Sequence, residues 1–201
     1  MMRLVFASSN LGKVKEVQAI LAGVRVETLQ DHPEVIMPPE TEPTFEGNAR
    51  LKAEHVSQVL GVPALADDSG LEVDALHGAP GVISARYGPG TDADRTQKLL
   101  TELRDVPDEA RTARFRCAMA FSVPGEPTQM TEGTCEGSIA RSPRGTGGFG
   151  YDPVFVLTLD QRTMAELTPE EKNTCSHRAR ALAKMRAMLE RYFSLVREQG
   201  E

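Results

Sequence analysis

Two adjacent carboxylates, Asp67 and Asp68, are the residues of this chain whose types and spacing are best suited to chemistry. They follow a short apolar segment over residues 63–66 and precede Ser69 and Gly70. Carboxylates this close repel one another, and a divalent cation relieves the repulsion because hard cations prefer carboxylate oxygens. A solvated turn is the alternative, since Asp, Ser and Gly favour turns for local reasons. The pattern predicts a buried strand over residues 63–66 that ends in a tight turn at the carboxylates.

A second stretch, residues 8–13, is suited to binding an anion. It is a polar loop between a predicted strand over residues 3–7 and a helical pattern that begins at Val14. The N–H groups and the positive dipole at the start of a helix attract an anion, and Lys13 adds a full charge. A lysine in this place opposes the dipole, which favours a phosphate ligand over the alternative that the loop only caps the helix.

A glycine-rich loop over residues 141–152 carries two aromatic residues, Phe149 and Tyr151. Glycine allows a backbone to approach a ligand closely, and an exposed ring can stack on a nucleotide base. A flexible surface loop is the alternative, but such a loop needs no rings. We therefore interpret the loop as a site for a flat ring.

Basic residues gather where two predicted helices begin. Lys172 lies in a short helix that starts with a capping box, and Ser176 caps a long amphipathic helix with His177 and Arg178 in its first turn. Positive charge at a helix start opposes the dipole. The pattern therefore favours an acceptor opposite these side chains over the alternative of a solvated first turn.

These features together indicate a nucleotide ligand, with phosphates, a bound cation and a base. Hydrolysis of a phosphoanhydride needs charge neutralisation and a positioned water molecule. In this interpretation Asp68 ligates Mg²⁺ and accepts the proton of the water, while Lys13 holds the phosphates. The chain lacks the Walker loop, the dinucleotide fingerprint, and the zinc-protease and serine-hydrolase motifs.

The elements that must position these residues alternate between strands and helices, with one hairpin at residues 124–127. At 201 residues the chain is long enough for one domain with a substantial core. Asn48 and Lys52 share a helix face at i and i+4, for which a solvated face is the alternative. We therefore expect an α/β fold with a mixed sheet. The predicted strands are 3–7, 24–29, 63–66, 112–123, 128–138 and 154–157, and the predicted helices are 14–21, 45–60, 92–104, 169–173 and a long one from 177.

Composition argues against several partners and compartments. The net charge is −6, from 23 Lys and Arg against 29 Asp and Glu, which argues against nucleic acid or an anionic membrane as the main partner. The three cysteines suggest no disulfide framework, which fits a reducing cytoplasm. Residues 1–7 are too short for a signal peptide, and no apolar segment approaches membrane-spanning length.

Six motifs together resemble the inosine/xanthosine triphosphate pyrophosphatase family, the HAM1-like proteins. Each motif alone is modest, but in this order they are specific, and they extend from the first predicted strand to the last predicted helix. They are Ala7-Ser-Ser-Asn-Leu-Gly-Lys-Val14, Thr44-Phe-Glu-Gly-Asn-Ala49, Ala66-Asp-Asp-Ser-Gly-Leu71, Gly78-Ala-Pro-Gly-Val-Ile-Ser-Ala-Arg-Tyr87, Gly145-Thr-Gly-Gly-Phe-Gly-Tyr-Asp-Pro153, and Glu166-Leu-Thr-Pro-Glu-Glu-Lys172 with Ser176-His-Arg178.

The resemblance implies a single ITPase-like α/β domain over residues 1–201. Its mixed, twisted central sheet would have flanking helices and two lobes around an active-site cleft. The resemblance also implies a homodimer that hydrolyses deaminated purine nucleoside triphosphates (ITP, dITP and XTP) to the monophosphate and pyrophosphate. Such an enzyme uses Mg²⁺ and cleanses the nucleotide pool.

Roles for individual residues follow from the resemblance as well. Asp68 is implied as the proton acceptor and as a metal ligand. Family members often carry paired acids before Thr-Phe and before Asn-Ala, but here Pro39 and Gly47 each replace one acid and leave Glu40 and Glu46. We assign Glu40 as the second metal ligand, with water as the alternative. The implied substrate-binding residues are Ser8, Ser9, Asn10, Leu11, Gly12, Lys13, Ser69, Phe149, Gly150, Tyr151, Asp152, Lys172, His177 and Arg178.

Base recognition can be argued from chemistry. A donor such as Arg178 would pair with the oxygen that hypoxanthine and xanthine carry where adenine has an amino group, and would leave adenine unmatched.

Two competing functions fit part of the pattern. A Maf-like pyrophosphatase acting on other modified nucleotides shares the Ser-Ser-Asn start, but not the glycine-rich loop or Ser-His-Arg. A non-catalytic nucleotide sensor would keep the phosphate-binding loop without needing the paired Asp.

Overall fold

A computed structural model describes residues 3–199 of the chain, with side chains through residue 195. The strands form one six-stranded sheet in the order β2-β1-β3-β4-β5-β6. Strand β1 pairs in parallel with β2 and β3, whereas β5 and β6 are antiparallel, so the sheet is mixed as predicted. The strands are β1 (Leu4–Phe6), β2 (Val26–Thr28), β3 (Ala64–Val73), β4 (Thr112–Ser122), β5 (Gln129–Ile139) and β6 (Phe155–Leu157).

Helices follow the strands along the chain, which confirms the predicted α/β class. Within residues 3–199, no helix combines the length and apolar character needed to cross a membrane. The α-helices are α1 (Leu11–Ile20), α2 (Phe45–Leu60), α3 (Asp92–Glu102), α4 (Pro169–Cys175) and α5 (His177–Gln199). Short 3₁₀ helices are η1 (Asp74–Leu76), η2 (Gly81–Arg86), η3 (Asp108–Ala110) and η4 (Met164–Glu166).

The chain divides into two compact units. Strands β3, β4 and β5 each begin in one unit and end in the other, so the chain passes between the units within these strands. The first unit comprises Met1–Asp68, Cys117–Gly133 and Arg178–Glu201, and the second comprises Ser69–Arg116 and Thr134–His177.

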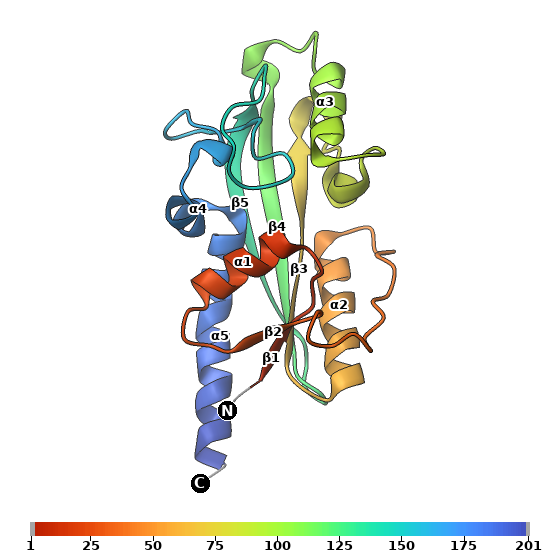
Figure 1. The fold of residues 1–201 in the computed structure, drawn as a ribbon, viewed down its shortest axis with the longest axis vertical. Coiled ribbons are helices and arrows are strands. Elements are labelled where there is room, and N and C mark those ends of the chain that lie inside the picture. The colour runs from red at the N-terminus through yellow and green to blue at the C-terminus, as the bar shows by residue number, and fades with distance from the viewer. Residues whose placement is uncertain (1–2, 200–201) are drawn as a thin grey trace. The chain divides into compact units, whose positions relative to one another are not determined.

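The core of the first unit forms where α1 and α5 pack on β1, β3 and β4. Apolar residues at helical spacing, such as Val14 and Val17 in α1 and Leu182 and Met185 in α5, are buried against the strands. Figure 1 shows α2 and α5 on opposite sides of the strands of this unit. A side chain on β3 can therefore face either α2 or the pair α1 and α5.

The predicted turn at the two adjacent carboxylates is wrong. Strand β3 continues from Ala64 through Asp67 and Asp68 to Val73, and both carboxylates are buried. The prediction failed because it treated the carboxylates as groups that must reach solvent or a metal ion. Lysine and arginine side chains of the protein neutralise them instead, so the strand has no physical reason to end there.

The second unit contains a buried arginine that binds backbone carbonyls. Arg111 donates from Nε to the carbonyl of Ile139 at 2.7 Å and from Nη2 to that of Ala140 at 2.9 Å, while Nη1 donates to the carbonyl of Leu103. These bonds connect the residues that follow α3, the start of β4 and the end of β5. Buried carbonyls need donors, so Arg111 satisfies three acceptors at once.

Replacing Arg111 with Met should lower the free energy of unfolding by about 3 kcal/mol, because three carbonyls lose a donor. Urea unfolding of the purified protein measures this loss. The control is Arg114→Met, which removes a partly exposed arginine of β4 that pairs with Asp74 and Glu136. The control should cost about 1 kcal/mol or less. Equal losses for the two variants would contradict a special role for Arg111.

Candidate active site

Asp68 lies on β3 with its carboxylate held by two side chains of α2. Its Oδ2 accepts a hydrogen bond from Asn48 Nδ2 at 3.1 Å, and its Oδ1 lies 3.4 Å from Lys52 Nζ. Asn48 and Lys52 are both buried, so the predicted shared helix face is confirmed and the solvated alternative is wrong. One turn of a helix thus presents two donors to one carboxylate.

Lys52 also pairs with a second carboxylate from the loop before α2. Its Nζ lies 2.7 Å from Glu40 Oε1, so one ammonium group bridges Glu40 and Asp68. Asn48 shapes the same loop, because its side-chain amide accepts from the N–H of Glu42 and donates to the carbonyl of Glu42. The structure thus brings the two predicted metal ligands to one cation.

The structure gives a physical reason for glycine at position 47, where family members often carry an acid. A Cβ at this position would lie 2.7 Å from Glu42 Cβ, closer than such atoms approach. The loop that carries Glu40 and Glu42 therefore passes close against the first turn of α2. A second acid at position 47 would require this loop to move.

The carboxylates of Glu40 and Asp68 suit a magnesium ion better than a metal that takes all its ligands from the protein. In the described part of the chain, no three His, Cys, Asp or Glu side chains gather closely enough to hold a metal ion. Mg²⁺ is commonly bound by one or two carboxylates, with water and substrate phosphates as its other ligands. Glu40 and Asp68 already share one cation, Lys52, so the donor set is suited to positive charge.

The surroundings of Asp68 shift the pKa of its carboxyl upward. Burial raises the pKa of this carboxyl, while the nearby Lys52 and Lys13 lower it and Glu40 and Asp67 raise it. The net result is a raised pKa. Burial alone would lower the pKa of Lys52, but Asp68, Asp67 and Glu40 raise it, so the ammonium stays charged. Asp68 is therefore a carboxylate prepared to accept a proton.

Asp67 faces the other side of β3 and has the opposite character. Successive side chains of a strand point to opposite faces, so Asp67 points toward α1 and α5. Its Oδ2 lies 3.1 Å from Lys13 Nζ and accepts from Arg178 Nε at 3.1 Å and from Nη2 at 3.0 Å. Burial alone would raise the pKa of Asp67, but Lys13 and Arg178 hold it well below its usual range.

Arg178 completes a buried ion-pair network with a residue that the sequence did not single out. Its Nη1 donates to Glu16 of α1, and the arginine is only 1% exposed. Glu16 lies three residues after Lys13, so the two side chains share one face of α1. This spacing is the feature of the sequence that could have indicated Glu16 as part of the network. Arg178 is buried, so the alternative of a solvated first turn is wrong for this residue, and its acceptors are protein carboxylates. Binding of a ligand by Arg178 stays a prediction.

The loop over residues 8–13 starts α1 by ordinary capping. Asn10 is the N-cap, and its Oδ1 accepts from the N–H of Lys13 at 3.1 Å. Ser8 Oγ accepts from the N–H of Asn10 at 3.2 Å, and Ser9 and Leu11 are exposed. The capping alternative is thus present in the structure. Phosphate binding by these residues stays a prediction.

In the second unit, the glycine-rich loop is centred on a buried carboxylate. Asp152 accepts from the N–H of Phe149 at 2.9 Å and pairs with Lys172 of α4. Lys172 Nζ also lies 4.7 Å from the centre of the Phe149 ring, within reach of a cation–π contact. Phe149 is half-buried, whereas Tyr151 is buried and donates from its hydroxyl to the carbonyl of Ser84. Of the two rings, Phe149 is the more accessible for stacking.

Two other predicted substrate-binding residues of the second unit are His177 and Ser69. The imidazole of His177 stacks on the ring of Phe115, with centroids 4.8 Å apart and planes at 17°. Ser69 follows Asp68 on β3 and is half-buried. Roles for both in substrate binding stay predictions.

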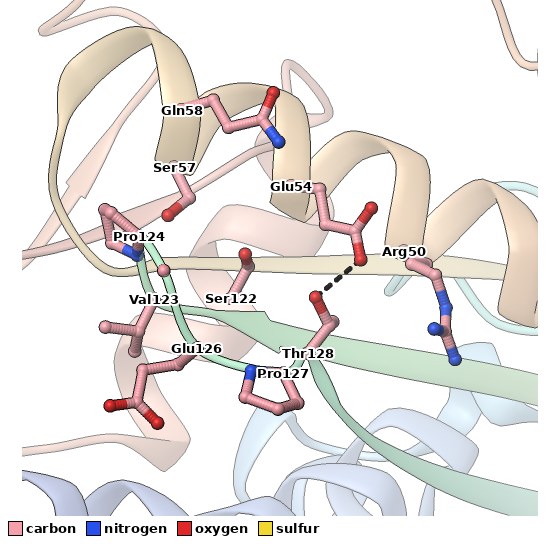
Figure 2. Close-up of a pocket in the computed structure, with 11 residues that line it drawn as sticks. Arg50, Glu54, Ser57, Gln58, Ser122, Val123, Pro124, Glu126, Pro127 and Thr128 are labelled. Carbon is pink, nitrogen blue, oxygen red and sulfur yellow. Dashed lines mark hydrogen bonds between the residues drawn. The ribbon is translucent and has the colours of Figure 1, made fainter.

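A pocket of about 470 Å³ lies elsewhere in the first unit, between α2 and the turn that joins β4 to β5. Figure 2 shows that its lining residues include Ser57 and Glu54 of α2 and Thr128 of the hairpin, and Thr128 donates to Glu54 at 2.6 Å. None of the predicted site residues lines it. This pocket is therefore distinct from the candidate site.

Replacing Lys52 with Met should raise the pKa of Asp68 further, because the positive charge of Lys52 stabilises the charged carboxylate. Carboxyl ¹³C NMR titration of the protein with a chelator present measures the shift. The control is Lys15→Met, which removes an exposed lysine of α1. An unchanged or lowered Asp68 pKa in the Lys52 variant would show that the pair is not electrostatically coupled.

Comparisons with known proteins identify the family of the chain. The Ham1 family profile matches residues 4–188. A Geobacillus kaustophilus protein named dITP/XTP pyrophosphatase is 56% identical over 189 residues, which cover 92% of this chain and 93% of that protein. A protein of the same name from Symbiobacterium thermophilum is 50% identical over 98% of each chain. The structure of a HAM1 protein from Coxiella burnetii has a TM-score of 0.85 and 43% identity, and covers 95% of this chain and 100% of its own. The chain therefore belongs to the Ham1 family.

Proposed function

We propose that this protein hydrolyses deaminated purine nucleoside triphosphates, namely dITP, ITP and XTP, to the monophosphate and pyrophosphate. The observation that carries the proposal is Asp68, a buried carboxylate with a raised pKa, beside Lys52 and Glu40. The family supports the same reaction, because relatives about half identical over nearly the whole chain are named dITP/XTP pyrophosphatases. Such an activity would remove deaminated nucleotides from the cellular pool.

Asp68 would act as the general base toward the attacking water. A general base works best when its pKa lies near the working pH, and burial moves the pKa of Asp68 in that direction. Asn48 and Lys52 hold the two carboxylate oxygens and so fix their orientation. The oxygen of the water would attack the α-phosphorus while its proton passes to Asp68. The bond from this phosphorus to the bridging oxygen would break, and pyrophosphate would leave.

Asp68 and Glu40 would hold Mg²⁺. When bound, this ion would neutralise the negative charge of the phosphate oxygens. Lys52 already lies between the same carboxylates, and Lys13 pairs with Asp67. The chain thus places two ammonium groups close to Asp68.

Recognition of the substrate would fall to the residues that the family resemblance implies. Ser8 to Lys13 and Ser69 would bind phosphates and sugar, and residues 149–152, Lys172, His177 and Arg178 would bind the base. Lys172 and Asp152 form a buried, charged pair next to the Phe149 ring, which suits a polar flat ligand. A buried group that must pair with the 6-oxygen would reject adenine, because adenine leaves it unmatched.

We also propose, from the family resemblance, that the protein works as a cytoplasmic homodimer. Its net charge of −6 argues against nucleic acid as a partner and leaves the free nucleotide as the substrate. Gel filtration with light scattering would test the dimer.

Replacing Asp68 with Asn should reduce turnover of dITP by about 10²–10⁴-fold, because the base is lost while its shape remains. The assay separates pyrophosphate from orthophosphate and compares dITP, XTP, dATP and dGTP, with Mg²⁺ and with a chelator. Asp74→Asn is the matched control, since Asp74 pairs with Arg114 away from the site. Release of orthophosphate alone would refute the reaction, and full activity of the Asp68 variant would refute the base.

Replacing Glu40 with Gln should raise the Mg²⁺ concentration needed for half-maximal activity, because one carboxylate ligand is lost. A magnesium titration of the dITP reaction measures this. Glu42→Gln changes an acid in the same loop and should leave the requirement unchanged. If the Glu40 variant also keeps the wild-type requirement, water rather than Glu40 occupies the second position.

A further inference from the structure

Helix α3 holds both backbone groups of one residue in the glycine-rich loop. Asp92 Oδ2 accepts from the N–H of Gly150 at 2.8 Å, and Thr96 Oγ1 lies 3.4 Å from the carbonyl oxygen of Gly150, to which it donates. Asp92 and Thr96 are one helical turn apart, so they face the same neighbour. Thr96 is buried. One face of α3 therefore fixes the two peptide groups that flank Gly150.

These two peptide groups determine where the neighbouring side chains point. Gly150 has φ of +60°, a left-handed conformation that suits glycine. Each of these planar peptide groups is shared with a neighbour, so holding both restricts one side of the backbone of Phe149 and of Tyr151. The orientation of the Phe149 ring therefore depends on contacts made by α3.

The rest of the loop has its own attachments. Gly147 donates from its N–H to the carbonyl of Ala165 at 3.0 Å, and the Tyr151 hydroxyl donates to the carbonyl of Ser84 at 3.0 Å. Neither contact constrains the Gly150 peptide groups directly. Within the loop, the carbonyl of the first of these peptide groups accepts from the N–H of Asp152 at 3.2 Å. From outside the loop, Asp92 holds the N–H of Gly150 and Thr96 holds its carbonyl.

Asp92 is oriented for this contact and is not needed to start the helix. Its Oδ1 pairs with Arg95, whose Nη1 also donates to the carbonyl of Gly90, so Oδ2 is directed to Gly150. The start of α3 is capped by other residues, because Thr91 and Asp94 form a reciprocal capping box. Asp94 therefore caps the start of α3, whereas Asp92 binds the loop.

We propose that Asp92 and Thr96 are positioning residues for the base-binding loop, acting through Gly150 and not on the nucleotide itself. This inference rests on the proposed function, in which residues 149–152 bind the base. Loss of the Asp92 contact would let the loop adopt other conformations and would weaken binding of the base. The base is remote from the reacting phosphorus, so the loss falls on binding and not on the chemical step.

The first test needs no substrate. Amide hydrogen exchange of the wild type and of Asp92→Ala compares the protection of residues 149–152. Asp92→Ala should speed exchange in this segment, because the Gly150 N–H loses its acceptor. Asp94→Ala should destabilise the start of α3 and leave the loop protected. Equal protection of the loop in Asp92→Ala and wild type would overturn the proposal, whether or not dITP is turned over.

The second test is kinetic. Asp92→Ala should raise KM for dITP about tenfold with kcat within about twofold, a loss in the range for one charge-assisted hydrogen bond. The preference for dITP over dATP should fall by a similar factor. Asp92→Asn keeps an oxygen that can accept from Gly150, so it should restore most of the affinity.

The Asp94→Ala variant separates positioning from stability. It should lower the melting temperature while KM for dITP stays at the wild-type value. If Asp92→Ala and Asp94→Ala raise KM equally, α3 acts only through general stability and the proposal is wrong. If the wild type itself fails to turn over dITP, the proposed function fails, and the exchange experiment still decides the role of Asp92.

Discussion

The structure of the first unit depends on burying two adjacent carboxylates in the middle of a strand. Removing an ion from water costs several kcal/mol unless charges and hydrogen bonds compensate it. Because neighbouring side chains point to opposite faces, Asp67 and Asp68 cannot share a single cation on one face. Lys13 and Arg178 compensate Asp67, whereas Lys52 and Asn48 compensate Asp68. This requirement explains why basic residues converge on the strand from α1, α2 and α5.

The two faces give the same kind of side chain opposite properties. Asp67 has a pKa far below that of an ordinary aspartate, so it remains charged and serves as a fixed anion. Asp68 has fewer compensating contacts and a raised pKa, which makes it the one able to exchange a proton. Pairs of carboxylates whose environments separate their pKa values in this way are typical of acid–base catalysis. The division of roles therefore follows from which face of β3 each residue occupies.

Local patterns predicted most of the fold but not the local structure around the carboxylates. The helix over residues 45–60 and the capping box that starts the short helix of Lys172 were confirmed, because spacing and capping act between near neighbours. The turn at Asp67 was wrong because its compensating charge comes from Arg178, 111 residues away. The sequence alone cannot show that such distant groups meet. For the same reason the contact between Asp92 and Gly150 had no signal in either segment taken alone.

The pairing of Asp67 with Arg178 also has a consequence for how the chain is made. Asp67 of β3 is synthesised 111 residues before Arg178, the arginine that neutralises it. Helix α5 supplies Leu182 and Met185 to the core of the same unit. During synthesis, the first unit therefore lacks part of its charge balance and part of its core until the last helix emerges. The first unit is therefore completed only after α5 has been made, well after its strands β1 and β2.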